Sequence, residues 1–546
     1  MISPIFFQEL PEIYRVLPNL KQDFMKTSLQ KSTRFINCTI SGIPKANAIL
    51  CNEGAIKTIG LSNEMVGDKT IDLRGGIVYP GFTDSHLHLL GLGMSLETLN
   101  LANITSLEKI IEKTVKKLKS INKGYWLQGW GWDQNNWRDT GYPTKEMLDA
   151  VSPKSPVYLK RIDGHAAWVN SRALTIANIT KKTRDPDGGK ILRDNYGTPT
   201  GILIDSAMEL VRQFIPKYSK ADKKRMVLKA VSQLNSLGIT FVHDAGTDLE
   251  TIEILKNLIS EKQLNICIYA MLTNNHEVYD NYLKSGPFFD NKGYLIVRTI
   301  KLFLDGALGS SGAALLHPYY DDPENMGLIL LDIQKTIDKV KKFNSAGFQV
   351  SIHCIGDRAN RIGLNILETA GERKLRNRIE HAQIIHPNDI TRFANIGVIP
   401  SMQAIHCTSD MYWVNKRLGA DRLNEVCTWQ SLLKAGTIIA GGSDAPVESP
   451  DPLSGIYAAV TRKDKAGEPA DGWQGHERLT REQALLMYTQ WPAYASFLEN
   501  KRGKIKPGFQ ANFTVLSKNL ISVLPEDILK TKVLFTIVNG KVVYAE

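Results

Sequence analysis

Two histidines separated by a single residue form the first group of side chains that could do chemistry. His86 and His88 lie in residues 81–88, with the sequence GFTDSHLH. In a strand, residues i and i+2 point to the same side, so both imidazoles would face one point. Two imidazoles facing one point are suited to binding one metal ion. A chance pair among the eleven histidines is the alternative interpretation.

Two further histidines stand at the ends of apolar runs. His353 ends the run that starts at residue 348, and His381 ends the short run 378–380. Active sites of α/β barrels are built where parallel strands end. A core histidine with a satisfied hydrogen bond would explain either residue alone. Four histidines at the same end of three predicted strands are harder to explain in that way.

An aspartate and a lysine complete the candidate set. Asp444 follows small residues in the stretch 440–446 (AGGSDAP), where it would project into the site, although an aspartate before a proline is also a common turn signal. Lys301 interrupts an apolar run, which is costly unless the side chain is paired, exposed or chemically changed. A buried lysine easily becomes a nucleophilic amine. Such an amine can capture carbon dioxide and form a carbamate that bridges two metal ions, while an outward lysine on a surface strand is the alternative.

The middle of the chain alternates strand runs with helical stretches, a pattern typical of parallel βαβ units. Eight such units predict a closed (β/α)8 barrel of the TIM type, with an open doubly wound sheet as the competing architecture. The strand candidates are residues 76–80, 239–243, 264–271, 297–304, 349–353, 378–380, 398–402 and 437–441.

The two ends and one long gap suggest additions to this barrel. Short β runs lie at both ends of the chain, and the turn Asn539-Gly540 is typical of a hairpin. About 150 residues separate the first two strand candidates and include five of the nine tryptophans. We expect a disordered lead-in at 1–30, a small β-sandwich from 31–76 and 500–546, and a barrel at 77–499 with an inserted cap at about 95–225.

Composition narrows the class of protein. The 546 residues are 43% hydrophobic and 23% charged, which excludes fibrous and mostly disordered chains. The net charge of +11 comes from scattered lysines, so no nucleic-acid partner is expected. The six cysteines form no C-x-x-C pair, which fits a reducing cytoplasm. No apolar run reaches the ~18 residues of a membrane span, so no membrane partner is expected.

Taken together, these motifs resemble the amidohydrolase superfamily of metal-dependent hydrolases, and most closely its N-substituted formamide deformylase subgroup. The resemblance extends from about residue 47 to residue 540. It implies that His86 and His88 bind one metal with Asp444, that carboxylated Lys301 bridges two metals, and that His353 and His381 hold the second. The implied cofactor is one or two divalent ions, with zinc expected. The implied partner is a small-molecule substrate, and relatives are often homodimers.

The resemblance also implies a reaction. Metal-activated hydroxide would attack an amide carbonyl, with Asp444 as general base and then general acid. His165 would donate a hydrogen bond to the oxyanion, or else make a structural contact within the insertion. The alternatives are hydrolysis of a lactone, ester or cyclic amide on the same site, or a non-catalytic relative. Deamination is disfavoured, because deaminases of this superfamily generally lack the bridging lysine.

Overall fold

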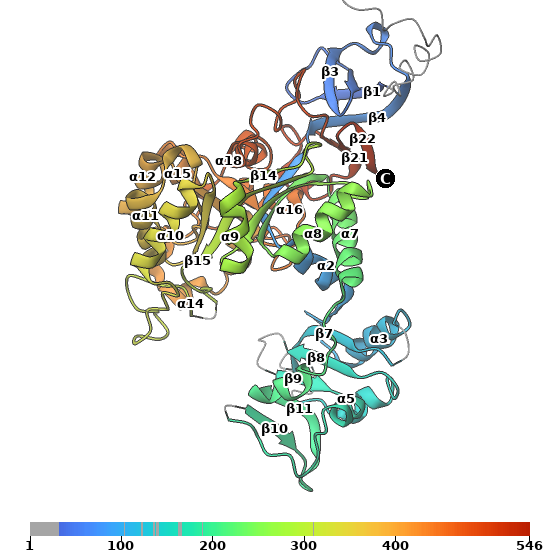
Figure 1. Ribbon diagram of the computed structural model, residues 1–546, viewed down its shortest axis with the longest axis vertical. Coiled ribbons are helices and arrows are strands. Elements are labelled where there is room, and N and C mark those ends of the chain that lie inside the picture. Colours follow the sequence, from blue (N-terminus) through green and yellow to red (C-terminus); the bar gives the residue numbers. More distant parts are fainter. Residues whose placement is uncertain are drawn as a thin grey trace, which may run out of the picture.

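The structure, a computed structural model, describes residues 32–102, 104–121, 124–134, 137, 141–161, 166–187, 189–309 and 311–546. The expected lead-in at 1–30 lies outside the described residues. The described strands are arranged in three sheets (Figure 1). None of the described helices is long and apolar enough to cross a membrane.

Eight parallel strands form the central sheet, in the order β5-β12-β13-β15-β16-β17-β18-β19. Backbone hydrogen bonds just beyond the last strand bring its two edges together, from Asp444 N to His86 O (2.7 Å) and from His88 N to Ala445 O (2.8 Å). The eight strands therefore form a nearly closed ring, and the prediction of a parallel eight-strand barrel is confirmed. The strands are β5 (Phe82–Leu87), β12 (Ile239–Thr247), β13 (Cys267–Thr273), β15 (Leu295–Phe303), β16 (Gln349–Cys354), β17 (Arg378–His381), β18 (Ile399–Gln403) and β19 (Ala440–Gly442).

The prediction of the first barrel strand at 76–80 was wrong. These residues end β4 (Lys69–Pro80), which belongs to a different sheet, and the barrel begins with β5. The apolar pattern runs through both strands, so the sequence does not show where one sheet stops. The break falls at Gly81, where a Cβ would lie 2.3 Å from Thr240 Oγ1 of the neighbouring strand β12. A residue without a side chain is therefore needed at the crossing.

A seven-stranded sheet combines both ends of the described chain, in the order β22-β21-β20-β4-β1-β2-β3. β4 pairs in parallel with β1 and antiparallel with β20, so the first and last parts of the chain share one ladder. Phe35, Val78, Phe513 and Ile537 are buried in its core. The remaining strands are β1 (Thr33–Ile40), β2 (Ala48–Asn52), β3 (Ala55–Gly60), β20 (Phe513–Leu516), β21 (Val533–Val538) and β22 (Lys541–Ala545).

Amphipathic helices pack around the barrel (Figure 1). In α10, Thr336, Val340 and Phe343 recur at helical spacing and are buried, and Asp332 caps the first turn by accepting a hydrogen bond from Lys335 N. The longer helices are α2 (Leu89–Glu97), α7 (Lys220–Ser236), α8 (Leu249–Ser260), α9 (His276–Ser285), α10 (Ile333–Ser345), α11 (Asp357–Ala370), α12 (Pro387–Ile396), α13 (Ala404–Asp410), α16 (Pro452–Thr461) and α17 (Arg481–Met487).

The region between β5 and β12 contains its own six-stranded sheet, in the order β10-β11-β9-β8-β7-β6. Figure 1 shows this region standing below the barrel, next to α2. Trp132, Trp137 and Trp168 pack against one another in its hydrophobic core, with ring centroids 6.1 to 6.5 Å apart. These three tryptophans therefore stabilise the region rather than line a substrate site. The strands are β6 (Leu99–Asn100), β7 (Leu127–Trp132), β8 (Val157–Arg161), β9 (Ala166–Val169), β10 (Gly189–Arg193) and β11 (Pro199–Asp205).

Close packing of α2 on α7 leads to a first prediction. A Cβ added at the buried Gly93 of α2 would lie 2.3 Å from the backbone oxygen of Met226 in α7. We expect Gly93→Ala to force the helices apart and to destabilise the protein by about 1–3 kcal/mol. Thermal unfolding measures the change. Gly309→Ala is the control, because its Cβ would find nothing nearer than 3.6 Å. Equal melting temperatures for the two variants would contradict the prediction.

Candidate metal centre

The ends of the barrel strands bring the candidate residues together. His86 lies in β5, Lys301 in β15, His353 in β16 and His381 in β17, each near the C-terminal end of its strand. His88 directly follows β5, and Asp444 lies two residues after β19. All six therefore gather at one end of the barrel, the end at which α/β barrels build active sites.

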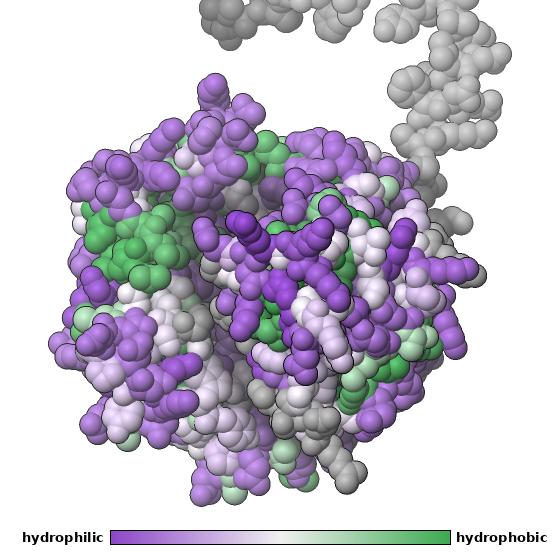
Figure 2. Space-filling view, turned by 90° about the horizontal axis from the view of Figure 1, so that it is seen from below, coloured by the Kyte–Doolittle hydropathy of each residue, from purple (hydrophilic) through white to green (hydrophobic). Residues whose placement is uncertain are grey.

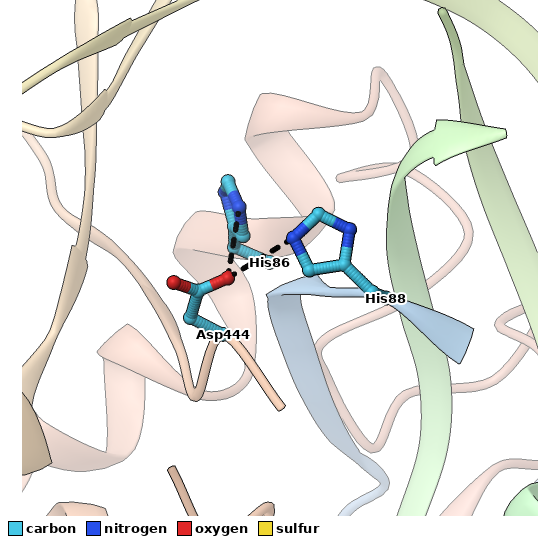
Figure 3. A group of neighbouring side chains, drawn as sticks. All are labelled: His86, His88 and Asp444. Atoms are coloured by element: carbon cyan, nitrogen blue, oxygen red, sulfur yellow. Dashed lines mark ion pairs between the residues drawn. The ribbon is translucent and has the colours of Figure 1, made fainter. Parts of the chain in front are cut away.

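His86, His88 and Asp444 form the tightest group (Figure 3). The Nε2 atoms of His86 and His88 lie 3.5 and 3.2 Å from the same carboxylate oxygen, Asp444 Oδ1. That oxygen is buried and makes no well-oriented hydrogen bond to any described residue. Two nitrogens and one oxygen that converge without hydrogen-bond geometry are the arrangement expected of donors that share a cation.

The other ring nitrogen of each histidine has a fixed partner. His86 Nδ1 contacts the Glu380 carboxylate, and His88 Nδ1 lies 2.7 Å from the backbone oxygen of Ala245. Because a carboxylate and a carbonyl accept hydrogen bonds, both histidines carry a proton on Nδ1 and present Nε2 as a lone pair to Asp444. Metal-binding histidines usually have such a partner, which fixes the tautomer and the ring orientation.

The carboxylate that contacts His86 Nδ1 belongs to a buried ion pair. Glu380 is fully buried, and its carboxylate accepts hydrogen bonds from Arg378 Nη2 (3.0 Å) and from the Ser351 hydroxyl. Arg378 Nε lies 2.8 Å from the same carboxylate and completes the ion pair. Burial alone would raise the pKa of Glu380, but Arg378 and His86 outweigh it and hold the pKa well below its usual range. Glu380 is therefore an anion that orients His86. The alternation Arg378-Ile379-Glu380 on one face of a buried strand was the sequence signal for this pair.

Lys301 is fully buried beside this group. Its Nζ lies 3.3 Å from His86 Nε2, and among the described residues no carboxylate lies within ion-pair distance. Burial lowers the pKa of Lys301 to about 8, even though Glu380 and Asp444 act in the opposite direction. The interpretation of Lys301 as an outward surface lysine was therefore wrong. With this pKa, roughly a tenth of the Lys301 side chains are neutral amines at pH 7, far more than for an ordinary lysine.

His353 and His381 form a second histidine pair next to His86. Their ring centroids are 4.5 Å apart, and the His381 ring is 4.9 Å from that of His86. His381 Nδ1 lies 2.9 Å from Gln403 Oε1, which leaves Nε2 free, and His353 Nε2 is buried without a hydrogen bond to any described residue. Burial lowers the pKa of His353 to about 3 and of His86 to about 4, and Lys301 adds to both shifts. Both imidazoles are therefore neutral, the form that binds metals.

Backbone conformation at the site is unusual. His381 and Asp444 have positive φ angles of 72° and 58°, in the left-handed region that residues with side chains rarely adopt. Such conformations cost about 1–3 kcal/mol each and occur mainly where function requires them. The chain therefore accepts strain at two of the six candidate positions.

Two histidines differ from the six candidates above: one was predicted but is not described, and one was not predicted. His165, the predicted oxyanion donor, lies outside the described residues. His406 was not predicted, although it follows the strand end at Gln403 by three residues, and it forms a second group of potential metal donors with His381 and Asp444. The spacing from the strand end was the only signal in the sequence that could have found it.

An aromatic ring forms part of the rim. Phe303 ends β15, two residues after Lys301, so both side chains point to the same side of the strand. The Phe303 ring lies 4.7 Å from Lys301 Nζ and 5.5 Å from the His353 ring, and the residue is 44% exposed. The face of the molecule that Figure 2 shows from below carries a patch of apolar surface beside a hollow. The centre is therefore bordered by at least one accessible apolar ring.

Fold and site together define a barrel with a histidine-rich centre, and comparison with known proteins gives its class. The model of the amidohydrolase family matches residues 69–544. The chain belongs to the amidohydrolase family, as the sequence motifs indicated.

Individual relatives cover nearly the whole chain. Putative amidohydrolase YtcJ of Bacillus subtilis is 34% identical over 525 residues, which cover 93% of this chain and 98% of the relative. The N-substituted formamide deformylase of Arthrobacter pascens is 26% identical, covering 91% and 95% of the two chains. The crystal structure of an uncharacterized metal-dependent hydrolase from Pyrococcus furiosus superimposes with a TM-score of 0.73 at 29% identity, covering 90% of this chain and 100% of that one.

Proposed function

We propose that this protein is a metal-dependent hydrolase that cleaves a carbon–nitrogen bond of an amide other than a peptide bond. The observation that carries the proposal is the convergence of His86 and His88 on Asp444 Oδ1, with the second nitrogen of each ring held by Glu380 and Ala245. The similarity to a solved metal-dependent hydrolase supports the same conclusion.

The donor set fits a divalent cation. His86, His88 and Asp444 would hold one ion, and His353 and His381 would hold a second, with Lys301 between the two positions. Neutral imidazoles and a carboxylate are ligands that zinc prefers. A bound cation of this kind supplies Lewis acidity, which lowers the pKa of water and polarises a carbonyl oxygen.

Asp444 is the proposed proton carrier. Burial alone would raise its pKa, but the neighbouring histidines, His88 and His86 foremost, hold the pKa below its usual range. The carboxylate is therefore anionic and can accept a proton from the water that attacks the carbonyl carbon. The same oxygen can then protonate the leaving nitrogen, so one residue acts as general base and general acid in turn.

Lys301 is the proposed bridge between the two positions. Its amine is buried, has a lowered pKa and lies next to the His86 donor atom. A neutral amine adds carbon dioxide and releases a proton, which gives a carbamate whose single negative charge is shared by two oxygen donors. A carbamate would explain why a lysine side chain occupies a position surrounded by metal donors.

Replacement of Lys301 tests this role. We expect Lys301→Ala to retain at most roughly half of the wild-type metal content, because a two-metal site would lose its shared ligand. Elemental analysis after purification without chelators measures the metal per chain. The exposed Lys335→Ala in α10 is the control and should keep the wild-type content. An unchanged metal content in Lys301→Ala would show that Lys301 is not a ligand.

The substrate class is proposed from the rim and from one relative. Phe303 offers an exposed ring to an apolar substituent beside Lys301 and His353. The relative from Arthrobacter pascens is an N-substituted formamide deformylase. We therefore propose an amide with an apolar substituent, of the N-substituted formamide or N-acyl amine type.

A substrate panel tests the proposed reaction. Metal-loaded protein is assayed with formanilide, N-acetylglycine and γ-butyrolactone, and released amine or acid is measured. We expect formanilide to be cleaved fastest, and chelation to abolish the activity. Faster cleavage of the lactone would show that the protein is an ester hydrolase rather than an amide hydrolase. No turnover of any compound, with no metal bound, would favour a non-catalytic relative.

A further inference from the structure

His406 lies at the candidate metal centre but is not one of the six predicted residues, and the proposed function gives it no role. One potential donor atom from each of His381, His406 and Asp444 lies within 4.8 Å of the other two. The rings of His381 and His406 are nearly parallel, with an angle of 18° between their planes and 6.3 Å between their centroids. His406 belongs to α13, which follows β18 directly. It therefore approaches the centre between the strand of His381 and the strand that leads to Asp444.

The hydrogen bonds of His406 are incomplete. Its Nε2 atom is buried and has no hydrogen-bond partner among the described residues. His381, by comparison, has Nδ1 engaged by Gln403. A buried polar atom without a partner is unfavourable, so a ligand that supplies an acceptor at this point gains from the contact. One ring nitrogen of His406 lies within 4.8 Å of a donor atom of Asp444, the proposed general base, so His406 borders the place where the reacting group of a substrate would lie.

We propose that His406 is a further catalytic residue, which donates a hydrogen bond from Nε2 to the carbonyl oxygen of the substrate. This inference rests on the proposed amide hydrolysis. Six other residues already supply donors for two cations, so a seventh is not needed as a ligand. A preorganised N–H donor aimed at a developing oxyanion stabilises the transition state more than the ground state. His406 would thus act on the substrate oxygen, while Asp444 acts on the leaving nitrogen.

Two substitutions test the role of His406. We expect His406→Ala to lower kcat/KM for formanilide by about 100- to 1,000-fold, the usual effect of losing one oxyanion donor. His406→Gln keeps an N–H donor and should recover part of the lost activity. Both variants should contain as much metal as the wild type, measured by elemental analysis. The exposed His276→Ala in α9 is the control and should match the wild type in every measurement.

A binding measurement separates this inference from the proposed function. Benzylphosphonate presents tetrahedral oxyanions like those of the addition intermediate, and its Kd is measured by calorimetry on metal-loaded protein. We expect weaker binding to His406→Ala than to the wild type, with intermediate binding to His406→Gln. If the wild type hydrolyses no amide but this order of affinities holds, the proposed function fails and the role of His406 stands. Equal affinity and equal kcat/KM in all variants, or a lower metal content in His406→Ala, would overturn the role given to His406.

Discussion

Asp444→Asn is expected to lower kcat for amide hydrolysis by roughly 100- to 10,000-fold, the range that a general acid–base residue contributes. An amide side chain of the same shape cannot accept the proton of the attacking water. His86 and His88 remain in place, since their Nδ1 atoms are held by Glu380 and Ala245 rather than by Asp444. We therefore expect the metal content to stay near that of the wild type.

Steady-state kinetics and elemental analysis check this result together. Asp338→Asn, an exposed position on α10, is the matched control and should leave both quantities unchanged. Full activity in Asp444→Asn would remove the role of proton carrier. Loss of metal together with loss of activity would show that Asp444 acts mainly as a ligand.

Arg378→Met is expected to cause the largest loss of stability. Arg378 is fully buried and neutralises Glu380, and it also donates hydrogen bonds to Ser85 O and Ser401 Oγ, both at 2.8 Å. Methionine would leave the Glu380 carboxylate buried without its main counter-charge. Removing one partner of a buried ion pair costs about 3–5 kcal/mol. We expect the melting temperature to fall by several degrees, and the metal content to fall because Glu380 no longer orients His86.

A nearby arginine provides the control for this substitution. Arg376 pairs with the partly exposed Glu499 at 2.6 Å, and a surface ion pair of this kind contributes at most about 1 kcal/mol. The melting temperature of Arg376→Met should therefore lie closer to that of the wild type than the melting temperature of Arg378→Met does. The double variant Arg378→Met/Glu380→Gln should regain part of the lost stability, because it removes the uncompensated charge. Equal melting temperatures for Arg376→Met and Arg378→Met would refute the argument.

The sequence predicted the barrel well because each strand–helix unit leaves a local signal. Seven of the eight strand candidates correspond to barrel strands, and the helices between them follow apolar periodicity. The first strand was misplaced because the apolar residues 76–82 run from the end of β4 into the start of β5 without a break. The pairing of residues 76–80 with β1 on one side and with β20, far away in the chain, on the other shows that they belong to another sheet.

The candidate site could be predicted only for residues with a distinctive local context. His86 and His88 show strand spacing, and His353 and His381 end apolar runs. Glu380 and His406 had only weak local signals, because their importance depends on what lies across the barrel from them. The contact between Glu380 and His86 joins residues 294 positions apart. The domain bounds and the roles of the six residues stay predictions that the experiments above address.

The seven-stranded sheet also affects how the chain emerges from the ribosome. Thr514 of β20 pairs with Tyr79 of β4, and it also accepts a hydrogen bond at 3.0 Å from Phe82 N, 432 positions away. At 5–20 residues per second, β4 therefore waits roughly 20 to 90 seconds for β20. During that time one edge of β4 is unpaired, and an unpaired edge is a template for aggregation. The nascent chain therefore exposes this edge of β4 until β20 has been synthesised.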